Sequence, residues 1–528
     1  MNEEHCDILL ATLNARYGHT AFGLRYLLAN MGPLRDRTQL LEFNIQQPAD
    51  QIVERLVREK PAILGLGVYI WNVAMVMGLL PRLRQSLPKT LMVLGGPEAS
   101  YDPDPRLEQQ ADYILFGEGD LAFAELCGQL LAGSRPANKI LRAPPPELEG
   151  LALPYDLYSG EDIAHRTIYV ETSRGCPYAC EYCLSSRDTR VRYFPMPALL
   201  TQFERLLERG VQQFKFTDRA LNLNIDRCRD LLEFFLAHYR PGVFLHLEMM
   251  PDRFPDSLKE ILTRIPASVM QCEIGVQTMN ADVASRIQRV QDMGKTLENI
   301  RFLRTKTHIY LHADLIAGLP GESMDSFAQG FDQLAAAGPH EIQLGILKRL
   351  RGSAISRHDE NWKMHYNAAP PYNLLSHSLI PVDDMRRIEH FAHYWDLISN
   401  SGNFIESSRF VWLGKDSVFH AFMKWSDWLF SRVHRVHGIP LTQLAEYLFH
   451  FITTECQIPA ATVGPVMLRD YQRGQRRDIP SFLRPFASQK ASGFPCPKYS
   501  VSGLKRQARH WAYDLEKEMK QPFLKQNE

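Results

Sequence analysis

Three cysteines stand close together in one short stretch of this 528-residue chain. Cys176, Cys180 and Cys183 lie in the run SRGCPYACEYC, which spans Ser173–Cys183, with the spacing CxxxCxxC. Three thiolates this close can hold one metal centre, although structural zinc and ordinary cubane clusters use four ligands. A [4Fe–4S] cluster held by three cysteines leaves one iron open for an outside ligand. The spacing therefore predicts an iron–sulfur site with a free coordination position.

Two other interpretations of the cysteine run stay open. The spacing i, i+4, i+7 would also place three structural thiols on one face of a helix. Gly175 and Pro177 flank the first cysteine, however, and favour a loop there. A zinc site is the second possibility, and it would need a fourth ligand from elsewhere in the chain.

The run resembles the cluster motif of the radical S-adenosylmethionine (SAM) enzymes. In both, CxxxCxxC carries an aromatic residue, here Tyr182, directly before the last cysteine. The resemblance implies that the open iron binds the amino and carboxylate groups of SAM. It also implies that reduction of the cluster, by an electron donor such as flavodoxin or ferredoxin, cleaves SAM to a 5′-deoxyadenosyl radical.

Residues 167–350, around this run, alternate predicted strands with helical stretches, which indicates a partial (β/α)6 barrel, open compared with the eight-stranded form. The strands are expected at 168–172, 213–217, 243–247, 269–276, 309–315 and 342–347. Chemistry in such barrels lies at the carboxyl ends of the strands. The polar residues there are Ser173, Asp218, Glu248, Gln277 and Asp314. Because buried polar groups need partners, we expect a polar ligand to supply them.

Four stretches of this segment resemble the SAM pocket of the coproporphyrinogen-dehydrogenase and methylthiotransferase branches. They read HLEMMP, EIGVQTMN, RIQRVQ and DLIAGLPGES. The resemblance implies SAM contacts from Glu248, Gln277, Arg289 and Asp314, with Ile316 beside the adenine. The planar guanidinium of Arg289 would suit a carboxylate. A solvated helix arginine is the alternative interpretation of that residue.

Residues 1–135 show a second alternation of strands and helices, which indicates a doubly wound parallel sheet. Strands are expected at 6–12, 39–43, 62–68, 90–94 and 113–116. Such sheets bind ligands beyond the carboxyl ends of their strands, and glycines there let the backbone approach a ligand. The loop residues expected at this edge are Tyr17, His19, Tyr69, Asn72, Gly95, Gly96, Glu98, Gly117 and Glu118.

This first segment resembles the N-terminal cobalamin-binding domain that precedes many radical SAM cores. The similar stretches are LGVYIWN, LGGPEAS and FGEGD. The DxHxxG motif, whose histidine ligates cobalt in other cobalamin proteins, is absent. The resemblance therefore implies base-off cobalamin without that axial histidine. His19 is the nearby candidate ligand, whereas a loop or capping role is the simpler interpretation of it.

The other segments have different compositions. Residues 136–166 are proline-rich and weakly periodic, which predicts a linker. Residues 351–528 are rich in tryptophan and show helical periodicity at 383–398, 416–432 and 441–454, so we expect a helical domain that could cover the barrel mouth. They resemble an uncharacterised domain that follows some cobalamin-type radical SAM cores. The basic runs Arg473–Arg477 and Lys505–Arg509 are expected to form a solvated face rather than a nucleic-acid site.

The composition of the whole chain limits the possible partners. Lys plus Arg and Asp plus Glu both number 60, which gives no global attraction to nucleic acid or to a membrane surface. We see neither a signal peptide nor an apolar run of roughly 18 residues that could span a membrane. An odd number of cysteines with one tight cluster favours the reducing cytoplasm over a disulfide scaffold.

Together these observations favour a cobalamin-dependent radical SAM enzyme acting on a small molecule. Methyl transfer to an unactivated carbon and radical ring formation are both open. A methylthiotransferase that modifies tRNA would need extra N-terminal cluster cysteines, and only Cys6 and Cys127 precede Cys176. A non-catalytic iron–sulfur or corrinoid sensor would need the cluster but not the polar residues at the strand ends.

Overall fold

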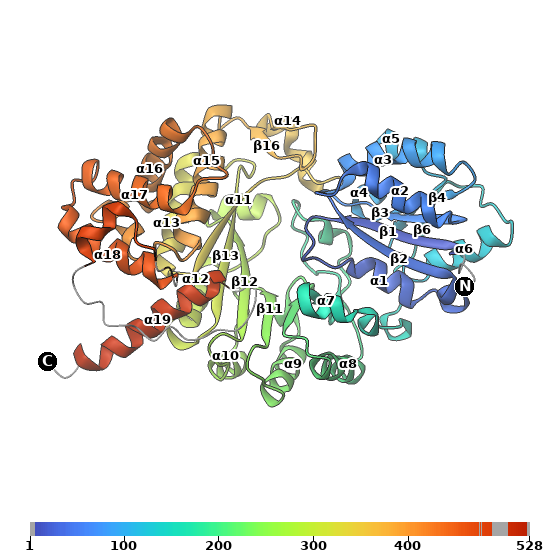
Figure 1. The fold of residues 1–528 in the computed structure, drawn as a ribbon, viewed down its shortest axis with the longest axis horizontal. Helices are drawn as coiled ribbons and strands as arrows, with labels where there is room; N and C mark the ends of the chain where they lie inside the picture. The colour runs from blue at the N-terminus through green and yellow to red at the C-terminus, as the bar shows by residue number, and fades with distance from the viewer. Residues whose placement is uncertain (1–5, 475, 477, 488–504, 525–528) are drawn as a thin grey trace. The chain divides into compact units, whose positions relative to one another are not determined.

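The computed structural model describes residues 6–474, 476, 478–487 and 505–524, and the chain divides into two compact units. The first unit contains Met1–Arg219, Lys348–Ser356 and Asn367–Asn373, and the second contains Ala220–Leu347, Arg357–Tyr366 and Leu374–Glu528. This division differs from the segment boundaries expected from the sequence, at residues 135, 166 and 350. It separates the first two barrel strands from the other four. Each unit is described by itself below (Figure 1).

The first unit begins with the doubly wound parallel sheet that the sequence predicts. Six strands pair in the order β2-β1-β3-β4-β5-β6, and every neighbouring pair is parallel. Their bounds are β1 Ile8–Asn14, β2 Thr38–Asn44, β3 Ile63–Gly67, β4 Leu91–Gly95, β5 Tyr113–Gly117 and β6 Ile140–Ala143. The prediction of the fold class is confirmed for this sheet.

Helices cover both faces of this sheet (Figure 1). On one face lie α2 (Ala49–Glu59), α3 (Val73–Ser86) and α5 (Pro105–Gln110), packed against a core that includes Leu9 and Leu64. On the other face α1 (Phe22–Ala29) and α6 (Ala122–Leu131) pack against Leu10 and Val93. Because successive strand residues point to opposite faces, the central strands β3 and β4 are apolar throughout, as a sheet covered on both sides requires.

The segment 136–166, expected as a linker, is folded as part of the first unit. It contributes β6, the edge strand of the sheet, and helix α7 (Gly160–His165). Ser159 and Asp162 form a capping box at the start of α7. The buried side chain of Asp162 also accepts a hydrogen bond from Arg25 Nη2 at 2.8 Å, which ties α7 to α1.

The barrel strands belong to both units. In the first unit β7 (Ile168–Val170) and β10 (Gln213–Phe216) pair in parallel, with α8 (Met196–Glu208) between them in the chain. The second unit holds β11 Phe244–Met249, β12 Met270–Gln277, β13 Tyr310–Ala317 and β14 Glu341–Ile346, all parallel to their neighbours. The intervening helices are α9 Ile225–Ala237, α10 Asp256–Thr263, α11 Ala281–Arg286, α12 Met293–Lys306 and α13 Met324–Ala337. The predicted six-stranded β/α architecture is therefore confirmed.

The C-terminal region is mostly helical, as expected. Its main helices are α15 Val382–Trp395, α16 Val418–Val433, α17 Leu441–Thr454, α18 Ala460–Arg473 and α19 Lys505–Leu524. Phe391 of α15 joins this region to the barrel helix α13, because its ring centroid lies 5.3 Å from that of Phe331. The ring of Phe419 in α16 lies 4.7 Å from Phe391 and extends the same aromatic core.

The two basic runs do not form the solvated face that was expected. Arg473 is buried and pairs with Asp470 and Glu406. Arg506 Nη1 lies 2.8 Å from Asp396 Oδ1. Gln475, Arg477 and the side chain of Lys505 lie outside the described residues.

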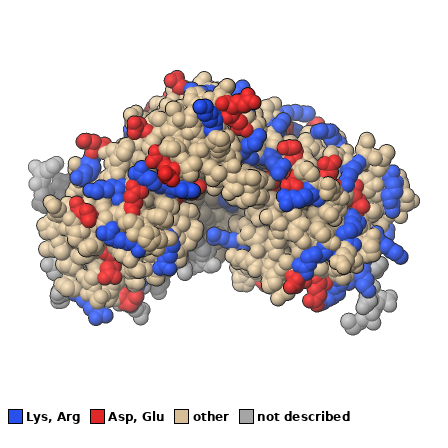
Figure 2. Space-filling view, turned by 90° about the horizontal axis from the view of Figure 1, so that it is seen from above, with Lys and Arg blue, Asp and Glu red and all other residues tan. Residues whose placement is uncertain are grey.

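Acidic and basic side chains are intermingled on the face seen in Figure 2. Because Arg473 and Arg506 are already neutralised, the runs do not favour nucleic acid. No helix among the described residues has both the length and the apolar character needed to cross a membrane.

Candidate functional site

The cysteine run forms a loop between two short strands of the first unit. Strands β8 (Ser173–Arg174) and β9 (Arg192–Tyr193) pair in an antiparallel ribbon that closes this loop. Cys176, Cys180 and Cys183 lie in turns and irregular backbone, so the interpretation as one helix face is wrong. Cys180 is buried, and the other two thiols are partly exposed. Tyr182 is partly exposed in the turn that precedes Cys183.

Gly175 sets the entry of the chain into this loop. Its φ of 92° lies in the left-handed region, and a Cβ atom there would overlap the carbonyl oxygen of Arg190. Only glycine fits such a conformation at such a close approach. The next amide, Cys176 N–H, donates to the carbonyl of Asp188 at 2.9 Å. The backbone therefore fixes the first cysteine.

Asp218, at the end of β10, anchors the start of the loop. It is 1% exposed and accepts hydrogen bonds from Ser173 Oγ at 2.6 Å and Thr172 Oγ1 at 2.7 Å. Burial raises the pKa of Asp218, and these hydrogen bonds oppose the rise. The expectation that a ligand would satisfy Ser173 and Asp218 is wrong, because they satisfy each other.

A zinc ion and an iron–sulfur cluster would place different demands on the three thiols of this loop. Within the described ranges, no group of three or more His, Cys, Asp or Glu side chains could hold a single metal ion. Structural zinc needs four ligands around one ion. A cubane cluster instead takes its thiolates on separate iron atoms, so its ligands can stand further apart. Three thiols on one loop, tied down by Gly175 and Asp218, fit the cluster.

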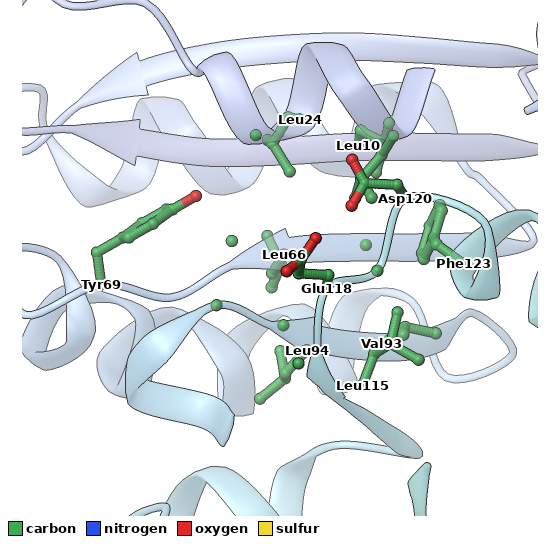
Figure 3. Close-up of a pocket in the computed structure, with 18 of the residues that line it drawn as sticks. Leu10, Leu24, Leu66, Tyr69, Val93, Leu94, Leu115, Glu118, Asp120 and Phe123 are labelled. Carbon is green, nitrogen blue, oxygen red and sulfur yellow. The ribbon is translucent and has the colours of Figure 1, made fainter. Parts of the chain in front are cut away.

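A cavity of about 310 Å³ lies in the first unit, on the face of the first sheet covered by α1 and α6. Figure 3 shows apolar side chains around it, including Leu24 of α1 and Phe123 of α6, with the carboxylates of Glu118 and Asp120 among them. The glycines that line it are Gly23, Gly65, Gly67, Gly95, Gly96, Gly117 and Gly119. Such a cavity has the size of a small-molecule site.

Glycines keep this space open and let the loops close around it. Gly96 has a φ of 97°, and a Cβ atom there would lie 2.6 Å from the carbonyl oxygen of Val68. The loop after β4 can therefore pack directly on the end of β3. The missing side chains leave a cradle with room for a buried group of a cofactor, which is what the resemblance to cobalamin-binding domains implies.

Five of the nine loop residues predicted for this site line the cavity. They are Tyr69, Gly95, Gly96, Gly117 and Glu118. Asn72 is not among the lining residues. It is buried, donates to the carbonyls of Leu13 at 3.0 Å and Gly67 at 3.1 Å, and so ties the ends of β1 and β3 together.

The other three predicted loop residues also bind protein groups outside the lining. Glu98 is buried and accepts a hydrogen bond from Tyr372 at 2.8 Å. His19 Nδ1 lies 2.7 Å from the hydroxyl of Tyr169, and burial lowers the pKa of His19. Tyr17 is exposed and donates to Glu161. In the structure His19 therefore makes the kind of loop contact that was the simpler interpretation of this residue.

Arg174 is the residue of this site that sequence reasoning missed. It lies directly before Gly175 and lines the cavity. Its Nη1 atom lies 2.8 Å from Glu118 and 2.9 Å from Asp120, and its Nη2 lies 2.9 Å from Glu171. Burial alone would lower the pKa of Arg174, but these carboxylates raise it well above its usual range. Its guanidinium also lies over the ring of Tyr26, 4.6 Å from the centroid.

Arg192 on β9 completes this ion-pair network. It is buried, pairs with Glu118 and donates to the carbonyl of Pro146 at 2.7 Å. Its Nη2 lies 2.9 Å from Asp188, whose carbonyl holds Cys176. The FGEGD loop of the cavity and the cysteine loop are therefore joined through two arginines. No sequence spacing signals this contact, because the partners are more than fifty positions apart.

In the second unit, the predicted SAM residues stand on alternating positions of parallel strands. Glu248 of β11 is opposite Glu273 of β12, and Asp314 of β13 is opposite Gly275. Ile316 follows Asp314 on the same face of β13, since side chains alternate along a strand. The strands therefore place Glu248, Asp314 and Ile316 at neighbouring register positions.

Histidines stand next to these carboxylates. His246 Nε2 lies 2.8 Å from Glu273 Oε2, and His312 Nε2 lies 3.1 Å from Asp314 Oδ1. Burial alone would lower the pKa of His312, but Asp314 and the neighbouring carboxylates raise it to about 9. Burial raises the pKa of Asp314. The signal that could have found His246, Glu273 and His312 is polar residues at a spacing of two within otherwise apolar strands.

Gln277 and Arg289 both come to the end of β12. Arg289 is buried, donates to the carbonyl of Gly275, and its Nε donates to Gln291 at 3.2 Å. The interpretation of Arg289 as a solvated helix arginine is therefore wrong. Gln277 has a φ of 70°, and its side-chain amide lies over Gly275, where a Cβ atom would overlap it. Positive φ in a non-glycine residue is uncommon and marks this strand end as unusual.

Comparison with family models decides what kind of protein carries these two sites. A model described as the B12 binding domain matches residues 8–127, and one described as the radical SAM superfamily matches residues 170–334. The chain therefore contains a B12-binding domain followed by a radical SAM domain. A third model, of a protein family of unknown function, matches residues 360–499. The two named domains imply a [4Fe–4S] cluster, SAM and cobalamin as cofactors.

Relatives of the B12-binding and radical SAM domains include methyltransferases. The cobalamin-dependent radical SAM methyltransferase TokK of Streptomyces tokunonensis is 26% identical over 344 residues, which cover 57% of this chain and 49% of TokK. The 2-(S-pantetheinyl)-carbapenam-3-carboxylate methyltransferase of Streptantibioticus cattleyicolor is 26% identical over 331 residues, covering 54% of this chain and 47% of the enzyme. The chain thus spans about half the length of these curated relatives.

Solved structures support the fold. The cobalamin-dependent SAM radical enzyme OxsB, with aqua-cobalamin and SAM bound, aligns with a TM-score of 0.61 at 12% identity. That alignment covers 96% of this chain and 83% of OxsB. The radical SAM methyltransferase TsrM of Kitasatospora setae aligns with a TM-score of 0.56 at 16% identity, covering 69% of this chain and 77% of TsrM.

Proposed function

We propose that this protein is a cobalamin-dependent radical SAM enzyme that transfers a methyl group to an unactivated carbon of a small molecule. Radical ring formation on such a molecule is the second outcome of the same machinery. The observation that carries the proposal is the place of Arg174. This one side chain lines the cavity of the B12-binding domain and directly precedes the loop of cluster cysteines.

When bound, the cluster and SAM supply a 5′-deoxyadenosyl radical, and cobalamin supplies a methyl carrier. Cys176, Cys180 and Cys183 would hold the cluster and leave one coordination position for SAM. Asp314, Glu248 and the groups at the end of β12 would orient SAM at the carboxyl ends of the barrel strands. The apolar walls of the first cavity would exclude water from the buried part of cobalamin.

Methylthiotransferase chemistry is less well supported. Cys6 and Cys127 are the cysteines that precede the cluster loop, and both are buried. Burial raises the pKa of Cys127 to about 12, so it would remain a neutral thiol. A second cluster needs more thiolate ligands than these two buried residues can supply.

The proposal includes a reducing compartment, the cytoplasm, and an electron donor such as flavodoxin or ferredoxin. None of the eight cysteines in the described residues forms a disulfide, which agrees with this. Anaerobic reconstitution with iron, sulfide and hydroxocobalamin, followed by reduction with SAM in a small-molecule extract, tests the function. We expect 5′-deoxyadenosine and a methylated or cyclised product. If cluster-replete protein does not cleave SAM, the result would favour the alternative of a non-catalytic iron–sulfur or corrinoid sensor.

Filling the cavity of the first unit should prevent the binding of cobalamin. Gly23 lies in α1 and lines the cavity, and a Cβ atom there would meet only the Tyr69 hydroxyl, at 3.5 Å. Gly23→Leu should therefore keep the helix and occupy the cavity. We expect retention of hydroxocobalamin through gel filtration to fall at least tenfold, because the buried group loses its space.

Gly78→Leu is the matched control for this cavity-filling variant. Gly78 is an exposed helical glycine in α3, with open space around its Cα. This variant should retain corrinoid like the wild type, with a similar melting temperature. If Gly23→Leu also binds corrinoid normally, the cofactor lies outside this cavity.

Removing the side chain of Asp314 should weaken the binding of SAM. Loss of a polar partner typically costs about 1–3 kcal/mol, so we expect SAM affinity of Asp314→Ala to fall roughly ten- to a hundredfold. Iron content should stay normal, because Asp314 is not a cluster ligand in this proposal. Equilibrium dialysis with cluster-replete protein measures the affinity. Asp282→Ala, which removes an exposed carboxylate from α11, is the control and should bind SAM normally. Equal affinity in both variants would place the SAM pocket elsewhere.

A further inference from the structure

The second unit contains another cavity, of about 370 Å³. It is lined by the end of α13, by the Gly338–His340 turn that leads into β14, and by side chains of the C-terminal helical region, including α19. The cavity therefore lies at the amino end of β14. Chemistry in parallel barrels takes place at the carboxyl ends of the strands, so this cavity is separate from the proposed SAM site.

One wall of this second cavity is aromatic. The rings of Trp395 and Trp412 have centroids 5.7 Å apart, and Tyr513 of α19 also lines the space. Trp395 is 4% exposed, and its indole N–H finds no hydrogen-bond partner within the described part of the chain. A buried donor without a partner carries a desolvation cost, which a ligand bearing an acceptor would remove.

Several ionisable groups in the lining are already balanced. Arg304 Nη1 lies 3.1 Å from Asp514 Oδ2, so their charges offset each other. Burial lowers the pKa of His340 to about 4 and that of His510 to about 3, and both rings are therefore neutral at pH 7. The charge of the cavity is thus set by the remaining side chains.

Two opposite charges in the lining have no ionic partner. Asp332 of α13 accepts a hydrogen bond from the Phe419 amide at 2.8 Å, but pairs with no cation among the residues described. Arg409 is exposed at the cavity with its guanidinium 5.5 Å from the centroid of the Tyr513 ring. It likewise pairs with no anion in the described ranges. The cavity thus presents one anion and one cation that are free to bind ligand groups.

We propose that this cavity binds a small zwitterion with an apolar body, which is the chemistry of a free α-amino acid. Arg409 would bind the carboxylate through its planar guanidinium, Asp332 would bind the ammonium, and the tryptophans would contact the side chain. A single amino acid suits a volume of this size. Because the cavity lies at the amino end of β14, opposite to the strand ends that carry the chemistry, the amino acid would act as a regulator rather than as a substrate.

Isothermal titration calorimetry on the full chain tests this inference. The probes are L-phenylalanine, phenethylamine, which lacks the carboxylate, and 3-phenylpropionate, which lacks the ammonium. We expect L-phenylalanine to bind and each analogue to bind at least about tenfold more weakly, since each leaves one charge unpaired. Equal affinity for either analogue, or no binding of L-phenylalanine at millimolar concentration, would overturn the zwitterion site.

Two variants assign the two charges. Arg409→Gln should weaken the binding of L-phenylalanine and of 3-phenylpropionate, while the affinity for phenethylamine should stay unchanged. Asp332→Asn should weaken the binding of L-phenylalanine and of phenethylamine. The amide oxygen of the new asparagine can still accept the hydrogen bond from the Phe419 backbone N–H. Each loss is expected to be about tenfold or more. If both variants bind L-phenylalanine like the wild type, the assignment is overturned.

Arg432→Gln is the matched control, because Arg432 also lies over an aromatic ring, that of Trp428, but does not line this cavity. It should bind L-phenylalanine like the wild type. A loss as large as that of Arg409→Gln would mean that the effect does not arise in the cavity. The titrations need neither SAM nor cobalamin, so their outcome is independent of the proposed enzymatic function.

Discussion

Replacing Cys176, Cys180 and Cys183 together with alanine is expected to abolish incorporation of iron and sulfide. These thiols lie on one loop that Gly175 and Asp218 hold in place. Without them, the described part of the loop offers no other thiolate. Iron and sulfide analysis after anaerobic reconstitution measures the loss, and the absorbance of the cluster should disappear with it.

The melting temperature of this triple variant should change little, because Asp218 and the β8–β9 ribbon remain intact. Cys456→Ala is the control, since Cys456 is a partly exposed thiol of the second unit. It should load iron normally. A triple variant that still incorporates a full cluster would contradict the assignment.

Arg174→Met is expected to destabilise the first unit and loosen the cysteine loop. The variant leaves Glu118, Asp120 and Glu171 without the guanidinium that they share. Removing one partner of a buried ion pair typically costs about 3–5 kcal/mol. We therefore expect a large decrease in the free energy of unfolding, measured by urea denaturation. Corrinoid retention and cluster content should both fall, because this side chain contacts the cavity and adjoins the loop.

Arg190→Met is the matched control on the same loop. The side chain of Arg190 is 72% exposed and lies 3.5 Å from Glu147, itself exposed. Surface pairs of this kind contribute about 0–1 kcal/mol, so this variant should unfold like the wild type. If the two variants lose similar stability, the buried network does not hold the loop. The double variant Arg174→Met with Asp120→Asn should lose less than the sum of its single changes.

Local patterns were enough to predict the architecture. Buried strands such as β3 and β4 are continuous apolar runs bounded by turn residues, and helical periodicity separates them. The cysteine loop was predictable because its residues are neighbours in sequence. Strand β6 escaped detection because it has four residues, two of them exposed, and lies at a sheet edge.

Contacts between distant residues could not be predicted. Ser173 and Asp218 look like ligand groups from their places at strand ends, and only the fold shows that they bind each other. Arg473 belongs to a basic run, yet Asp470 and Glu406 neutralise it inside the protein. Asn72 occupies a loop at the ligand edge but uses its amide to join two strands. Each side chain has a local setting that suits a ligand, and a tertiary partner takes that place.

The sixth strand of the first sheet has a practical consequence for dividing the protein. A fragment ending at residue 135 would remove β6 and expose the hydrogen-bonding groups of β5 along a free edge. Exposed edges of this kind recruit other chains and lead to aggregation. The same cut would remove α7 and leave Arg25, which is buried in α1, without Asp162. The segment between the two named domains therefore caps and protects the first of them, and does not merely space them apart.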